Sequence, residues 1–134
     1  MKLRECRHGR TTVFHLEGEI DTHYAPALRA LFAAKASAQC PALVLDFGGV
    51  TFIDSTGIAL VIEYLRDCSA FGGHFCIAGP TEPVRHILDI VQLAKALPIF
   101  DRVEQALAAM SAGCMPAPEQ RLFGAVESES SVAA

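Results

Sequence analysis

The stretch Val44-Leu-Asp-Phe-Gly-Gly-Val-Thr-Phe-Ile-Asp-Ser-Thr-Gly-Ile58 decides which fold the sequence predicts. Its first part is apolar and typical of a strand, its glycines indicate a loop, and its last part opens an apolar-periodic helix. A strand followed directly by a helix is the repeating unit of a parallel α/β sheet. Ser55 stands at the start of this predicted helix, after Asp54 and before Thr56 and Gly57.

The position of Ser55 leaves two interpretations open. Backbone N–H groups at a helix N-terminus are unpaired and the helix dipole is positive there, so a phosphate on Ser55 would be favoured. The alternative is that Ser55 is an ordinary N-cap, because Ser, Thr and Asp are preferred caps of helices in general. Position alone favours the N-cap.

The regions on either side predict the element order ββαβαβαβα. The expected elements are strands over 2–8 and 11–18, a helix capped by Asp21 or Thr22 with Pro26 in its first turn, a strand over 42–47, a helix over 55–71, a strand over 74–79, a helix capped by Thr81, an edge strand over 97–100 and a last helix from Asp101 or Arg102. Short connections between strands and helices indicate an α/β fold with a mixed, mostly parallel sheet of four to five strands, an antiparallel first hairpin and about four helices.

The helix over 55–71 carries a one-sided apolar pattern. The residues predicted to face the core are Ile58, Val61, Ile62, Leu65, Cys68 and Ser69. With Ile58 at the centre of that face, Leu60 points to the opposite side and Tyr64 lies on the flank. Leu60 is therefore a candidate contact residue for a partner, one turn from Ser55. The alternative is an exposed leucine without a role, which is common.

Length and composition predict one compact domain. Of the 134 residues, 51% are hydrophobic, and from Gly113 the chain becomes rich in Pro, Glu and Ser, so we expect a domain over 1–112 and a C-terminal tail over 113–134. A net charge of -4 without clustered Lys and Arg argues against nucleic acid as a partner. The sequence has neither a secretory signal nor an apolar run near the ~20 residues that cross a bilayer, so we expect a cytoplasmic protein that does not bind a membrane.

The five cysteines, Cys6, Cys40, Cys68, Cys76 and Cys114, form no CxxC motif. Their odd number and the core phase of Cys68 and Cys76 indicate buried thiols, and Cys40 is placed near the start of a strand. No set of residues has the spacing of metal ligands, and no nucleotide-binding motif occurs, so no cofactor is expected.

Several short motifs occur at the ends of these predicted elements. Gly18-Glu-Ile-Asp21 closes the second strand, Leu45-Asp-Phe47 ends the third, Phe52-Ile-Asp-Ser-Thr-Gly-Ile58 opens a helix, and Gly72-Gly73 precedes the fourth strand. In this arrangement the chain resembles the STAS-domain family, specifically its stand-alone anti-sigma-factor antagonists, over roughly residues 3 to 110.

The resemblance implies a binding protein that is not an enzyme. In the family, the serine directly after the motif's aspartate, here Ser55, is phosphorylated by an anti-sigma factor that is a serine kinase. The unphosphorylated form binds that kinase and releases the sigma factor, and a serine phosphatase restores it. Asp21 matches the aspartate beside the phosphorylation site. Asp54, Thr56 and Gly57 match the rest of the motif, and we add Leu60 to the predicted partner-binding residues.

Two departures from the family pattern permit a divergent partner. Gln92-Leu-Ala94 stands where members usually have a glycine or another small residue after the third helix, and Ala59 stands where they often have glycine. An alternative function is a non-phosphorylated STAS subunit that regulates a lipid or anion transport ATPase complex. A hydrolase with Ser55 as the nucleophile is disfavoured because the nearest histidine in the sequence, His74, lies on another element.

Overall fold

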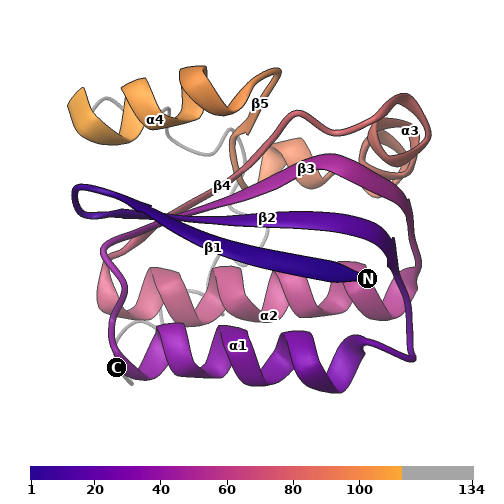
Figure 1. Ribbon diagram of the computed structural model, residues 1–134, viewed down its shortest axis with the longest axis horizontal. Coiled ribbons are helices and arrows are strands. Elements are labelled where there is room, and N and C mark those ends of the chain that lie inside the picture. The colour runs from indigo at the N-terminus through magenta and orange to yellow at the C-terminus, as the bar shows by residue number, and fades with distance from the viewer. Residues whose placement is uncertain (113–134) are drawn as a thin grey trace.

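The computed structural model describes residues 1–112, which form one mixed sheet with helices on both faces (Figure 1). The strands are β1 (Lys2–His8), β2 (Thr11–Ile20), β3 (Ala42–Ile53), β4 (His74–Ala78) and β5 (Ile99–Phe100), and the helices are α1 (Ala25–Ser37), α2 (Ser55–Phe71), α3 (Glu82–Ile90) and α4 (Val103–Ala112), with a 3₁₀ turn at Leu93–Lys95. The strands lie in the order β1-β2-β3-β4-β5, and only the β1–β2 pair is antiparallel. The predicted class, element order and first hairpin are confirmed. The predicted tail, 113–134, lies outside the described residues.

The two faces of the sheet are covered unequally. Because side chains alternate along a strand, Phe14 and Leu45 face α1 and α2, while Val13 and Val44 face α4. Figure 1 shows α1 and α2 side by side on one face and α4 on the other, with α3 at one end of the sheet. The larger core therefore lies between the sheet and the α1–α2 pair.

β3 is longer than the sequence predicted, because the strand does not end at Phe47. The glycine pair that indicated a loop forms a bulge instead, since His15 pairs with Asp46 but Glu17 pairs with Gly49. A side chain at position 49 would meet the Leu16 carbonyl oxygen at 3.0 Å, so β2 and β3 approach closely there. β3 then continues to Ile53. It thus carries the chain directly to the first turn of α2.

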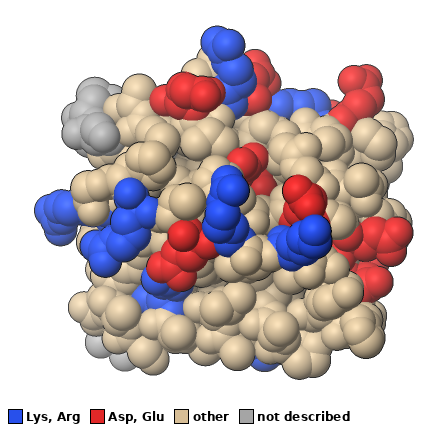
Figure 2. All heavy atoms as spheres, viewed as in Figure 1, with Lys and Arg blue, Asp and Glu red and all other residues tan. Residues whose placement is uncertain are grey.

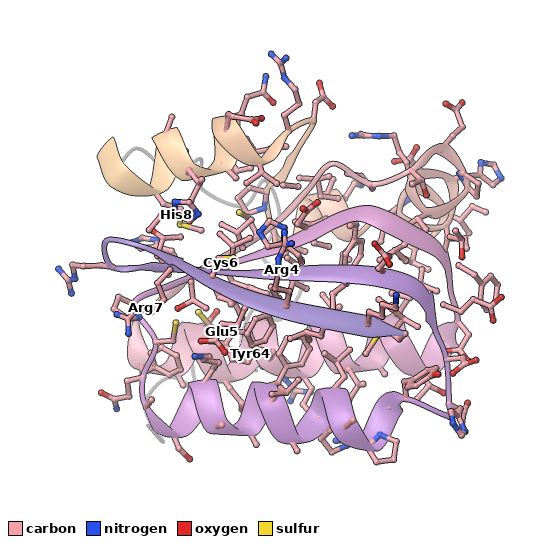
Figure 3. All side chains as sticks on the ribbon, viewed as in Figure 1. Arg4, Glu5, Cys6, Arg7, His8 and Tyr64 are labelled. Atoms are coloured by element: carbon pink, nitrogen blue, oxygen red, sulfur yellow. The ribbon has the colours of Figure 1, made fainter. Side chains whose placement is uncertain are left out.

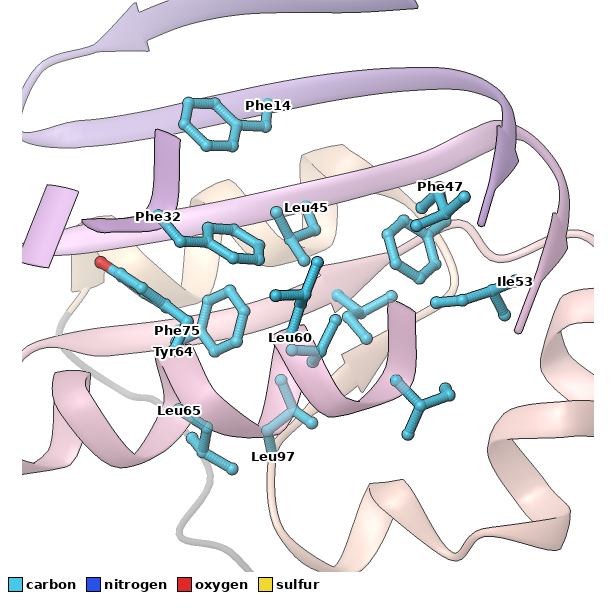
Figure 4. Close-up of a cluster of buried hydrophobic side chains, with 14 of the residues drawn as sticks. Phe14, Phe32, Leu45, Phe47, Ile53, Leu60, Tyr64, Leu65, Phe75 and Leu97 are labelled. Atoms are coloured by element: carbon cyan, nitrogen blue, oxygen red, sulfur yellow. The ribbon is translucent and has the colours of Figure 1, made fainter. Parts of the chain in front are cut away.

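α2 has the predicted bounds, and Gly72 ends it in the left-handed region with φ 76°. The predicted buried face was too narrow, however. Leu60 and Tyr64 are fully buried (Figure 4), so the expectation that Leu60 faces solvent was wrong. The reason is that α2 packs against α1 as well as the sheet, and the ring of Tyr64 lies 5.0 Å from that of Phe32 in α1. Two neighbours bury two sides of one helix.

The predicted caps of α1 and α3 were only partly right. The N-cap of α1 is Tyr24, not Asp21 or Thr22, although Pro26 does lie in the first turn. Thr81 is the N-cap of α3, but its hydroxyl donates to the carbonyl of Val50 at 2.7 Å and does not cap the helix. This hydrogen bond links the start of α3 to the C-terminal part of β3.

The predicted burial of three thiols is confirmed. Cys40, Cys68 and Cys76 are buried, and Cys6 is half-buried on β1. Burial raises the pKa of Cys68 to about 12, with a further contribution from Cys40, and burial raises the pKa of Cys76 to about 12. Cys68 and Cys76 are therefore protonated near neutral pH and pack as small apolar side chains.

Candidate functional site

The predicted site lies where β2 and β3 end side by side. Ile20 pairs with Ile53 at the end of both strands, and the N–H of Asp54 donates to the carbonyl of Ile20 at 3.1 Å. Asp21 directly follows β2, and Asp54 directly follows β3. Both aspartates therefore lie at the carboxyl edge of parallel strands, where open α/β sheets place their binding sites.

Asp54 caps α2, which leaves the hydroxyl of Ser55 free. Asp54 has extended backbone angles, and its Oδ1 accepts a hydrogen bond from the N–H of Gly57 at 3.0 Å. Ser55 is the first helical residue, it is exposed, and its hydroxyl has no hydrogen-bond partner among residues 1–112. The alternative that Ser55 is merely the N-cap was therefore wrong. The residue that follows the cap is available for chemistry.

The electrostatics at Ser55 combine two opposite effects. The N–H groups of Ser55 and Thr56 have no acceptor within the described part of the chain, and they lie at the positive end of the α2 dipole. Asp54 places a negative charge at the same terminus. The helix end thus favours an anion attached at Ser55, while the surface is already acidic.

Gly57 lies inside the structure, so the expectation that it contacts a partner needs correction. Gly57 is buried, and a Cβ there would lie 2.8 Å from Cγ2 of Ile20 and 2.7 Å from Cγ1 of Ile53. Only glycine lets the first turn of α2 sit this close to the two strand ends. Gly57 positions Asp54 and Ser55 and presents no surface of its own, and the buried Leu60 likewise cannot contact a partner directly.

Asp21 organises the turn between β2 and α1. Its Oδ1 accepts from the N–H of His23 at 3.0 Å and from the N–H of Tyr24 at 3.4 Å. The side chain is half-buried, and its second carboxylate oxygen makes no hydrogen bond with residues 1–112. Asp21 therefore has a structural role in the turn and still contributes negative charge beside the α2 terminus.

Thr22 belongs to the site and was not singled out from the sequence as a site residue. Its Oγ1 lies 3.5 Å from Oδ2 of Asp54 and 3.3 Å from Oγ1 of Thr56. These contacts link the loop after β2 to the first turn of α2. Its place directly after Asp21 at a strand end was the available signal. The hydroxyl of Thr56 consequently points toward Thr22.

A second polar cluster lies on the sheet face that carries α4. His15 Nδ1 and Asp46 Oδ2 are 2.6 Å apart, and Asp46 Oδ1 accepts from the N–H of Gly48 at 2.9 Å. Asp46 therefore holds the β3 bulge. In residues 1–112 no group of three or more His, Cys, Asp or Glu side chains is arranged to hold a metal ion, and no helix is long and apolar enough to cross a membrane.

Comparison with known proteins places these features in a wider context. The profile of the STAS domain matches residues 5–106. The chain is 28% identical over 108 residues to an anti-sigma F factor antagonist of Paenibacillus polymyxa. The aligned region covers 80% of this chain and 92% of that protein.

Two solved structures have the same architecture. An anti-sigma factor antagonist from Mycobacterium paratuberculosis has a TM-score of 0.76 at 26% identity, with 82% of this chain and 93% of that chain covered. The Bacillus cell fate determinant SpoIIAA in its phosphorylated form has a TM-score of 0.66 at 23% identity, with 80% of this chain and 97% of that chain covered. At that identity the second comparison shows the fold alone.

Proposed function

Because the chain belongs to the STAS domain family, we propose that it is an anti-sigma-factor antagonist that is switched off by phosphorylation of Ser55. Its partner is an anti-sigma factor with serine kinase activity, and a serine phosphatase reverses the modification. The protein acts by binding and is not itself an enzyme. This role places it in the cytoplasm, where sigma factors act.

The observation that carries the proposal is the free hydroxyl of Ser55. Asp54 caps α2, so Ser55 is exposed at the first helical position without a hydrogen-bond partner in the described residues. An exposed hydroxyl at this position is accessible to the active site of a kinase. In the reaction its oxygen attacks the γ-phosphorus of ATP, the bond to ADP breaks, and the hydroxyl proton passes to a base of the kinase.

Phosphorylation should act on the partner surface and leave the fold intact. A phosphate carries about −1.5 to −2 charges, and at a helix N-terminus the dipole favours it by ~0.3–1 kcal/mol. The same charge adds to those of Asp21 and Asp54. A like-charge contact across an interface costs several kcal/mol, whereas a loss of about 2.8 kcal/mol already weakens binding a hundredfold. The charge added at Ser55 therefore suffices to release the partner.

A two-variant binding experiment tests the switch. Ser55→Ala should bind the kinase partner like the unmodified protein, because it removes neither a cap nor a charge. Ser55→Asp should bind at least tenfold more weakly, about 1.4 kcal/mol, since one carboxylate supplies only part of the phosphate's charge. Titration calorimetry with the purified kinase at moderate salt measures both. Equal affinities of the two variants would contradict the proposal and favour the transport-complex subunit.

Asp21→Asn separates charge from turn structure. The Asn side-chain oxygen can still accept from the N–H groups of His23 and Tyr24, so the turn is retained while the charge is lost. We expect a lower phosphorylation rate or partner affinity with an unchanged melting temperature. A lower melting temperature together with normal kinase binding would show that Asp21 serves only the turn.

Phosphopeptide mapping after incubation with kinase and ATP should place the phosphate on Ser55 and not on Thr56.

A further inference from the structure

The outer edge of β1 is open along seven residues. β1 is the first strand of the sheet, and within residues 1–112 it pairs only with β2. Its free backbone N–H and C=O groups therefore form a template for another strand. Figure 1 shows this edge at the front of the molecule, with the start of β1 at the same end of the sheet as the start of α2. No residue of β1 belongs to the Ser55 site described above.

The exposed side chains along this edge are mainly cationic. Lys2, Arg4 and Arg7 are exposed, and none of them has an ion-pair partner among the described residues. The acidic residue between them, Glu5, is neutralised by Lys35 of α1 at 2.7 Å. The space-filling view shows these Lys and Arg side chains spread across this face, with Asp and Glu side chains between them (Figure 2). The exposed cations of β1 stand out in a chain whose net charge is -4.

The cations are distributed over both faces of the strand. Figure 3 shows Arg4 on the side away from α1 and Arg7 on the side toward it. Lys2 and Arg4 are two residues apart, so they share a face with a spacing of about 7 Å. They line a depression of about 680 Å³ whose other walls include His15 and Glu17. Asp46, also in this depression, is already bound to His15 at 2.6 Å and does not neutralise Arg4.

We propose that β1 binds an acidic extended segment of another protein, which adds to the sheet as an antiparallel or parallel sixth strand. Backbone hydrogen bonds to β1 supply affinity, and acidic residues at alternate positions of the segment face Lys2 and Arg4. A second copy of this chain is a poor occupant, because edge-to-edge pairing would bring the arginines of two β1 strands together. The charge of the edge therefore selects an acidic partner.

A peptide titration tests this surface on the full-length protein. The probe is a fluorescent heptapeptide, Glu-Thr-Glu-Thr-Glu-Thr-Glu, and the control probe has Gln in place of each Glu. Arg4→Glu should weaken binding of the acidic probe at least tenfold. Arg102→Glu makes the same change of charge at an exposed position before α4, near the opposite sheet edge, and should change affinity less than twofold. Equal effects of the two variants would overturn the proposal.

Two further measurements distinguish strand addition from simple charge attraction. Two N-methylated versions of the acidic probe are compared, one methylated at the odd-numbered and one at the even-numbered peptide nitrogens. Because only alternate N–H groups of an added strand point toward β1, at least one of the two versions should lose binding. Amide chemical-shift changes should be concentrated in β1, and changes centred on the start of α2 would overturn the proposal. Glu127→Gln combined with Glu129→Gln tests the chain's own C-terminal segment. A fivefold or larger gain in probe affinity would identify that segment, not another protein, as the occupant.

Discussion

Replacing Gly57 by alanine tests whether close packing positions the Ser55 site. The added Cβ would lie 2.7 Å from Cγ1 of Ile53 and 2.8 Å from Cγ2 of Ile20, distances at which atoms must move. Both isoleucines are buried, and their β-branched side chains have little rotamer freedom. Overpacking costs about 1–3 kcal/mol, and because two contacts fall below 3.0 Å we take the upper part of that range, about 2–3 kcal/mol. Against this cost, Ala gains about 1 kcal/mol over Gly from helix propensity. We expect a net loss of about 1–2 kcal/mol in the free energy of unfolding.

Thermal and urea unfolding followed by circular dichroism measure this loss. For a domain of this size it corresponds to a fall of roughly 3–8 °C in Tm. Ala59→Gly, two residues further along the exposed side of α2, is the matched control because it measures the propensity difference without the clash. After correction by that value, the packing cost at position 57 should be about 2–3 kcal/mol. A Gly57→Ala protein more stable than the original would refute the reasoning, because the side chains of Ile20 and Ile53 would then have moved aside without a cost in free energy.

Three further outcomes follow from local geometry. Asp54→Ala should lower the free energy of unfolding by about 0.5–2 kcal/mol through loss of the cap, while Ser55→Ala should change it by less than about 0.5 kcal/mol; urea titrations that gave the reverse order would place the cap on Ser55. Gln92 has φ 57°, so Gln92→Gly should raise stability by about 0.5–1 kcal/mol in the same assay, and a loss would mean that its side chain contributes a contact that outweighs the strain. With pKa values of about 12, Cys68 and Cys76 should have only about 10⁻⁴ of their thiols ionised at pH 8 and should escape iodoacetamide in the native protein, as mass spectrometry can show; labelling as fast as in urea would contradict their burial.

The sequence predicted best where local chemistry alone determines structure. α2 has the predicted bounds because a capping residue at its start and Gly72 at its end act within a few residues of the chain. The alternation of strands and helices also followed from local pattern. The position of Ser55 at the helix start was correct for the same reason, although its neighbour Asp54 proved to be the cap.

The errors arose where a distant segment determines the environment. Leu60 was placed on the solvent side and Tyr64 on the flank because helix phase describes one buried face, whereas α1 supplies a second packing partner. Gly49 indicated a loop, but β2 approaches it closely and β3 continues through a bulge. Thr22 was overlooked as a site residue because its contacts are with the start of α2, more than thirty positions away. None of these neighbours is visible in a local window of sequence.

The separation of the cap from the free hydroxyl has an evolutionary consequence. Asp54 and Gly57 carry the structural duties of the first turn of α2, through a hydrogen bond and through close packing. Ser55, which lies between them, has none of these duties. Under the proposed function, substitutions at position 55 can therefore be selected for recognition alone, because they leave folding almost unaffected. The proposed signal at this residue can then be gained, lost or altered without a change to the cap or to the packing around it.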